Sequence, residues 1–164
     1  MVTTEHLLVD GYNVIHDWPE MREAMKKDVN IACQNLADRL RILHDFEGIR
    51  VTVVFDGRGE GVEILRPGNE QTFSLVYAPG NSSADEIIIQ LVQNSKNPNK
   101  LTVVSRDNMI RNLVREGGSE IYTPSDLLAR IEACERRQSQ ALYRRNREVE
   151  KEWKETERNG EEVE

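Results

Sequence analysis

The stretch HLLVDGYN (residues 6–13) decides the fold class, because in it a short apolar run ends in an acid that a glycine follows directly. Two later stretches also lead from an apolar run to an acid: VTVVFDG (51–57) leads to Asp56, and LTVVSRD (101–107) leads through Ser105 and Arg106 to Asp107. Short, continuous apolar runs rich in valine predict buried strands of a parallel sheet. Parallel strands end at one common edge, so we expect Asp10, Asp56 and Asp107 to converge there.

A further pair of acids opens a helical pattern in the stretch SADE (83–86). Ser83 and Glu86 have the spacing of a capping box, in which Glu86 is expected to reach back to the Ser83 amide. Asp85, at the second helical position, is free of that role, and the helix dipole favours an anion there. Carboxylates gathered at one edge repel one another, and a hard divalent cation suits their oxygen atoms. The pattern therefore indicates a metal-dependent phosphodiesterase site.

The rest of the chain alternates strand and helix. Apolar runs predict strands at 6–10, 51–56, 72–78, 101–104 and 120–122. Helical spacing predicts helices at 28–46, 84–93, 108–116 and from Pro124 onward, while four glycines and Pro67 mark 57–69 as a loop. Strands that alternate with helices imply right-handed crossovers and a doubly wound, mostly parallel α/β sheet. Neither a P-loop nor a Rossmann glycine pattern is present in the sequence.

Composition limits the function classes. The chain has 164 residues, of which 31% are charged, as expected for a soluble domain with an appendage. Cys33 and Cys134 lack CxxC spacing, so they indicate two reduced thiols and not a zinc site. The sequence shows no apolar run long enough for a membrane span and no signal peptide pattern, so we expect a cytoplasmic protein, monomeric or weakly self-associating.

The stretches LLVDGYN (7–13), VVFDG (53–57), SADE (83–86) and SRD (105–107) occur in the order of known family motifs. Together they resemble the NYN domain, in its bacterial YacP-like branch, a relative of the PIN nucleases. The resemblance covers about residues 5–131. It implies a PIN-like three-layer α/β sandwich, endoribonuclease activity on RNA, and Mg²⁺ or Mn²⁺ as cofactor. The residues at the motif positions are Asp10, Asn13, Asp56, Asp85 and Asp107, with Glu86 beside them.

We expect one or two divalent ions to be held by Asp10, Asp85 and Asp107, with Asp56 completing the pocket and Glu86 as a further candidate ligand. In-line attack by water would leave 5′-phosphate and 3′-hydroxyl ends. Each residue also has a structural alternative, as a strand-end turn, a helix cap or, for Asn13, an Asx turn. Two functional alternatives stay open: a non-catalytic RNA-binding or ribosome-binding module, and a DNA-directed or small-substrate metal phosphohydrolase.

The charge distribution predicts how strongly the protein binds RNA. A net charge of −7 predicts weak binding to free RNA with a shallow salt dependence, and by the YacP resemblance the ribosome is an expected partner. Arg106, Arg111 and Arg115 are candidates for guiding an RNA strand or for an ordinary solvated face. We expect a nuclease domain at 5–131, followed at 132–164 by a charged, solvated helical tail that frays toward Glu164.

Overall fold

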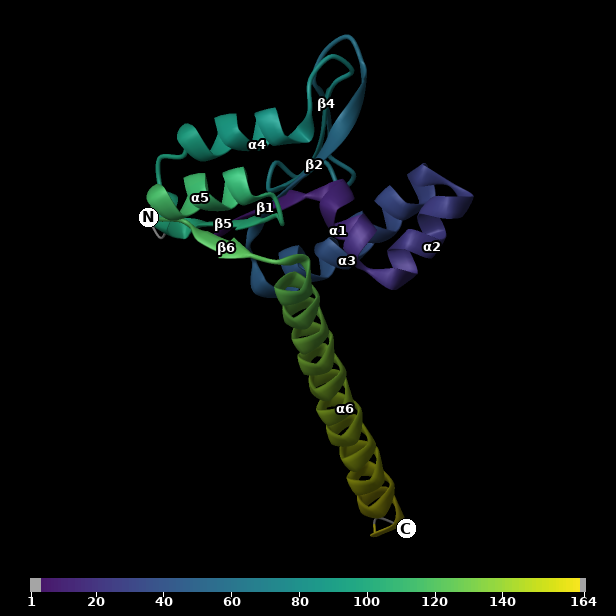
Figure 1. Cartoon of the computed structure of the whole chain (residues 1–164). Helices are drawn as coiled ribbons and strands as arrows, with labels where there is room; N and C mark the ends of the chain where they lie inside the picture. Colours follow the sequence, from purple (N-terminus) through teal and green to yellow (C-terminus); the bar gives the residue numbers. More distant parts are fainter. Residues whose placement is uncertain (1–3, 163–164) are drawn as a thin grey trace.

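A six-stranded sheet forms the centre of the fold in the computed structural model, which describes residues 4–162 (Figure 1). The predicted mostly parallel α/β sheet is confirmed: five strands run parallel, and one edge strand pairs antiparallel with its neighbour. In spatial order the strands are β3 (Glu63–Leu65), β4 (Phe73–Pro79), β2 (Arg50–Gly59), β1 (His6–Asp10), β5 (Leu101–Val104) and β6 (Glu120–Tyr122).

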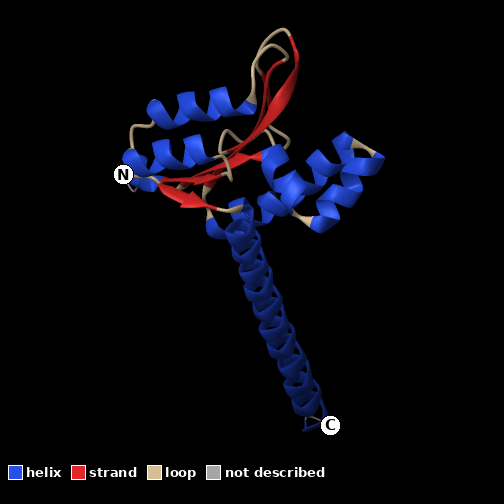
Figure 2. Cartoon of the chain, in the orientation of Figure 1, coloured by secondary structure: helices blue, strands red, loops and turns tan. Residues whose placement is uncertain are grey.

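Helices cover both faces of this sheet, which confirms the predicted three-layer sandwich (Figure 2). One face packs against α1 (Gly11–Asp17), α2 (Pro19–Lys27), α3 (Val29–Glu47) and the start of α6 (Pro124–Glu162). The other face packs against α4 (Ala84–Gln93) and α5 (Asn108–Glu116), and a short 3₁₀ helix, η1 (Pro98–Lys100), precedes β5. The alternation along β1 follows from this, because Leu7 and Val9 enter one core and Leu8 the other.

The topology changes direction at β1. The chain passes from β1 through α1, α2 and α3 to β2 on one side, and α4 carries the chain from β4 to β5 on the other side of β1. Ligands of doubly wound sheets bind at such a switch point, beyond the carboxyl ends of the strands. Asp10 is the last residue of β1 and therefore lies at this position.

Two segments differ from the sequence-based expectation. Residues 11–27 form α1 and α2, which were not predicted, and the loop predicted at 57–69 contains the end of β2 and all of β3. Tertiary contacts explain the first difference, because Trp18 between the two helices is buried and its Nε1 donates to the Pro124 carbonyl oxygen over 2.9 Å. The side chains of β3 are exposed, so backbone pairing with β4 forms this strand without an apolar pattern.

The helix α6 begins in the core and continues far beyond it. Leu127, Ile131 and Cys134 are fully buried, whereas the side chains of residues 139–160 are exposed all round the helix. Figure 1 shows this part projecting away from the sandwich. The proposed boundary between 131 and 132 lies inside this helix, which continues to Glu162, and residues 163–164 of the predicted frayed end lie outside the described residues. Within 4–162, no helix combines the length and apolarity needed to cross a membrane.

Candidate active site

Asp10 is the most buried of the predicted site acids, with 6% of the residue exposed. It occupies the N-cap position of α1, yet its side chain accepts no capping hydrogen bond there. Instead its Oδ2 accepts a hydrogen bond from Ser105 Oγ over 3.3 Å. Burial raises the pKa of Asp10 to about 7; the charge of Asp85 adds to the rise, and the Ser105 hydrogen bond opposes it. A carboxyl that titrates near neutral pH at a sheet edge is typical of a functional site.

The glycine after Asp10 is required by packing. A Cβ atom at Gly11 would lie 2.4 Å from the ring of Phe55. That ring is edge-on to Tyr12 and stacked on Tyr77, with centroids 5.3 and 5.1 Å away. The Asp-Gly pair therefore lets α1 start directly against a buried aromatic ring.

Asp56 joins the acids and also fixes the start of α4. Its Oδ1 accepts a hydrogen bond from the Ala84 N–H over 2.9 Å. The next residue, Gly57, lies so close to β4 that a Cβ there would be 1.1 Å from the Ala78 carbonyl oxygen. The side chain of Asp56 is exposed, and its charge contributes to the raised pKa of Asp10. Asp56 is thus placed both to bind a ligand and to position the helix that carries the next acid.

Asp85 and Glu86 have different surroundings at the start of α4. Asp85 is half-buried, and its pKa is raised first by burial and then by the charge of Asp107. Glu86 is exposed, and its Oε2 accepts a hydrogen bond from Ser82 Oγ over 2.5 Å. Ser83 does cap the helix, because its Oγ accepts from the Glu86 N–H, but Glu86 binds the Ser82 hydroxyl where a bond to the Ser83 amide was predicted. Asp85 therefore belongs to the acidic group, whereas Glu86 is exposed and has its own partner.

Ser105 links two of the acids, and the sequence did not single it out. It is fully buried, donates to Asp10, and accepts a hydrogen bond from the Asp107 N–H over 3.1 Å. Asp107 in turn caps α5, because its Oδ1 accepts from the Ile110 N–H over 3.1 Å. The available signal was a hydroxyl residue directly after the buried LTVV run, since such a group needs a partner.

Asn13 holds the 105–107 segment against α1. Its side-chain oxygen accepts a hydrogen bond from the Arg106 N–H over 3.0 Å. The Arg106 guanidinium pairs with Asp17 on the same helix, so this segment is held by both its backbone and its side chain. These contacts make Asn13 a positioning residue for Ser105 and Asp107.

The three arginines proposed to guide RNA differ in the contacts that they make. Arg106 is engaged by Asp17, and Arg111 donates to the Ser105 carbonyl oxygen over 3.3 Å. Arg115 is exposed in the last turn of α5, away from the helix start where Asp107 lies. Two of the three therefore stabilise the loop that carries the acids.

The four acids fit a hydrated divalent cation. Their charges are coupled through the raised pKa values of Asp10 and Asp85, and among the described side chains no Lys or Arg nitrogen lies within 4.0 Å of any of the four carboxylates. No three of them bring oxygen atoms within 4.8 Å of one another. A divalent cation held by these acids would therefore keep several of its waters, as Mg²⁺ usually does.

A tighter group lies elsewhere, where His44, Asp45 and Glu70 bring ligand atoms within 4.8 Å of one another. Arg41 pairs with both carboxylates of this group. The two ring nitrogens of His44 are already bonded, to Asp45 over 2.8 Å and to Thr72 over 2.7 Å. Arg41 offsets one of the two carboxylate charges and both nitrogens of His44 have partners, so this group forms an ion-pair network that joins α3 to the segment before β4.

Relatives of known structure have the same fold. The crystal structure of Rae1 (YacP) from Bacillus subtilis matches with a TM-score of 0.68 and 26% identity, covering 85% of this chain and 80% of that one. A mutant of the same protein matches with a TM-score of 0.68 and 26% identity over 83% of this chain and 79% of the other.

Sequence comparison agrees with these structures. The YacP protein of Bacillus subtilis (strain 168) is 29% identical over 133 residues, which cover 80% of this chain and 77% of the relative. The family model for the YacP-like NYN domain matches residues 7–164 and so includes all the acids described above as well as α6. The NYN domain is a nuclease-type fold. The chain belongs to the YacP-like NYN domain family.

Proposed function

We propose that this protein is a metal-dependent endoribonuclease that hydrolyses RNA phosphodiester bonds. The observation that carries the proposal is the convergence of Asp10, Asp56, Asp85 and Asp107 at the switch point of the sheet, where no described cation neutralises them. Membership of a nuclease-type family agrees with it.

Asp10, Asp85 and Asp107 are the residues that would hold Mg²⁺ or Mn²⁺, directly or through water. When bound, a divalent ion lowers the pKa of coordinated water and stabilises charge on a leaving oxygen. Asp10 is the anchor, because Ser105 fixes its carboxylate and burial excludes competing water. Glu86 is a weaker candidate, because its carboxylate is exposed and bonded to Ser82.

Asp56, Asn13 and Ser105 act mainly by positioning. Asp56 holds the first residue of α4, Asn13 holds the backbone of Arg106, and Ser105 joins Asp10 to the start of α5. Together they fix three separate elements around one edge of the sheet. Such outer contacts orient ligands, and their loss typically weakens metal sites by about 10–100-fold.

The test is a cleavage assay on single-stranded and structured RNA with Mg²⁺ or Mn²⁺, followed by end-group analysis. We expect internal cuts that leave 5′-phosphate and 3′-hydroxyl ends, and loss of cutting in EDTA. Products with 2′,3′-cyclic phosphate, or equal cutting in EDTA, would instead indicate a metal-free mechanism and overturn the proposal. DNA of the same sequence tests whether the substrate is RNA.

A further inference from the structure

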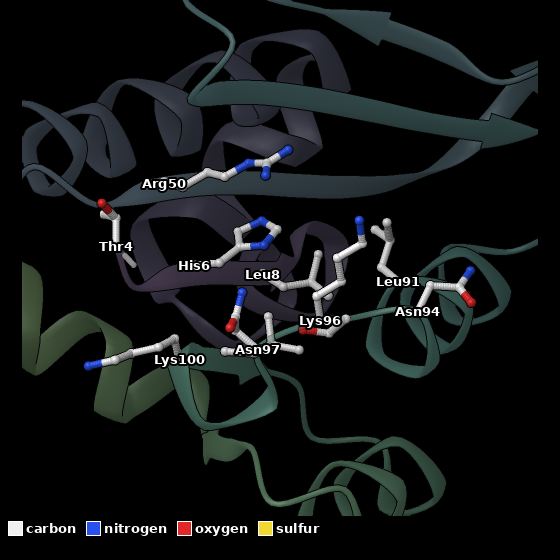
Figure 3. Close-up of a pocket in the computed structure, with 11 residues that line it drawn as sticks. Thr4, His6, Leu8, Arg50, Leu91, Asn94, Lys96, Asn97 and Lys100 are labelled. Atoms are coloured by element: carbon white, nitrogen blue, oxygen red, sulfur yellow. The ribbon is translucent and has the colours of Figure 1, made fainter. Parts of the chain in front are cut away.

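A groove lies beside α4, on the face of the sheet that α4 and α5 leave partly uncovered. It consists of two adjoining hollows of about 370 and 320 Å³ that share four lining residues, His6, Arg50, Leu91 and Asn94. The larger hollow extends to Lys96 and Lys100, beyond the end of α4, and the smaller one to Arg66 beside β3. Figure 3 shows the side chains of Arg50 and Lys96, from different elements, on two sides of the His6 ring, while Lys100 points away from them.

The groove concentrates unpaired positive charge in a chain of net charge −7. Within residues 4–162, no carboxylate oxygen lies within 4.0 Å of the charged nitrogens of Arg50, Arg66, Lys96 or Lys100. The arginines that join α3 and α6 to their neighbours are, by contrast, paired with glutamates. Burial and the charge of Arg50 lower the pKa of His6 to about 4, so the imidazole is neutral at pH 7 and adds no charge.

The groove lies at the amino ends of β1 and β2, opposite the acidic edge, and extends along α4 as far as Ile87, two residues from Asp85. His6 and Asp10 are the two ends of β1, so they are separated by about 13 Å along the strand. The helix α4 also spans the distance between the acids and the groove, because Asp85 lies in its first turn and Asn94 follows its last residue. A strand whose scissile phosphate lies at the acids therefore reaches the groove within a few nucleotides.

We propose that the groove beside α4 binds the phosphodiester backbone of single-stranded RNA that flanks the cleavage site. Arg50, Lys96 and Arg66 would bind phosphates, and the exposed amide side chains of Asn94 and Gln90 offer hydrogen bonds to sugars. The residues that line the two hollows include no Phe, Tyr or Trp, so base stacking contributes little and binding relies on phosphate contacts, which carry no sequence information. The identity of the strand as RNA rests on the proposed endoribonuclease function.

The test measures binding of a fluorescent oligouridine of about 12 nucleotides by anisotropy across a range of salt concentrations, in EDTA so that no cleavage occurs. The double variant Arg50→Gln/Lys96→Gln removes two exposed cations of the groove. The matched control Arg22→Gln/Lys27→Gln removes two exposed cations from α2. Each single-strand phosphate contact contributes about 0.7 to the log-log salt slope, so we expect the groove variant to lose about 1.4 and to bind about tenfold more weakly near 0.1 M salt.

The control should keep the affinity and slope of the wild type. Equal affinities and slopes for wild type and groove variant, or equal losses in both double variants, would overturn the proposal. Binding is measured without turnover, so the result for the groove does not depend on cleavage. If the protein cuts no RNA, the proposed function is refuted, and the binding data still test the groove. If the protein does cut RNA, the groove variant should have a raised KM on long RNA with kcat unchanged.

Discussion

Asp10 makes the metal-free protein sensitive to pH. A carboxyl whose pKa is higher in the folded than in the unfolded state stabilises the folded protein while it is protonated. This contribution to the free energy of unfolding is complete below the unfolded pKa of about 3.9. It is lost as the pH rises through the folded pKa. That folded value is about 7 for Asp10. In EDTA we expect Asp10→Asn to have a higher Tm than the wild type, with a difference that grows between about pH 4 and 7 and is level above that range. Thermal melts at several pH values measure this, and a constant difference would contradict it.

Single residues differ in how far the sequence predicts them. The sequence predicts the positions of Asp10, Asp56 and Asp107, because each ends or follows an apolar strand and the strand ends of a parallel sheet share an edge. It does not predict that of Ser105, because its bond to Asp10 joins residues 95 positions apart. Asn13 was recognised, but its bond to the Arg106 backbone spans 93 positions and follows from no local pattern.

The two neighbouring acids at the start of α4 should differ in their importance for catalysis. Asp85→Asn should reduce RNA cleavage more than Glu86→Gln, because Asp85 is coupled to the other acids and Glu86 is bonded to Ser82 on the surface. We expect a loss of about 100-fold or more for Asp85→Asn, at or above the upper end of the about 10–100-fold range for outer contacts. We expect a loss of less than about tenfold for Glu86→Gln, because Glu86 is exposed and bonded to Ser82. Rates under single-turnover conditions measure this. The reverse order, at equal Tm, would make Glu86 the ligand.

Elements with a strong apolar period were predicted, and elements formed by tertiary contact were not. The helix α3 follows from Leu36, Leu40 and Leu43 on one face, all fully buried. The helices α1 and α2 depend on Trp18, whose partner Pro124 lies 106 positions away. Strand β3 depends on pairing with β4 and has no buried side chain. The local apolar pattern therefore predicts the sheet and its crossovers. The elements that depend on long-range contacts, α1, α2 and β3, cannot be predicted from it.

Over the whole molecule, α6 divides into a part that belongs to the core and a part that does not. Removal of residues 141–164 should change Tm by no more than about 2 °C, because the described side chains in this range are exposed and surface changes are usually within about 0.5 kcal/mol. Removal of residues 131–164 should destabilise the protein strongly, because it also deletes the buried Ile131 and Cys134. Melting curves of both truncations measure this. A large loss from the shorter truncation would show that the tail stabilises the fold.

The net charge of the whole molecule predicts dependence on a partner. At a net charge of −7, wild-type protein should bind naked RNA weakly, with a salt slope no steeper than about −2 to −3, corresponding to three or four phosphates. We expect it to co-sediment with ribosomes, and we expect Arg111→Glu/Arg115→Glu to weaken that association. Tight binding to naked RNA with a steep salt slope would remove the need for a docking partner.

If the acidic edge binds the catalytic cation, Mn²⁺ should raise the melting temperature of the protein. A ligand at 100 times its Kd stabilises the folded state by about 2.7 kcal/mol, which raises Tm by about 5–10 °C in a protein of this size. Wild-type protein and the control variant Asp45→Asn, at the ion-pair network beside Arg41, should both show this rise. Asp10→Asn should lose it. An equal rise in Asp10→Asn, or its loss in Asp45→Asn alone, would contradict the account and place the cation elsewhere.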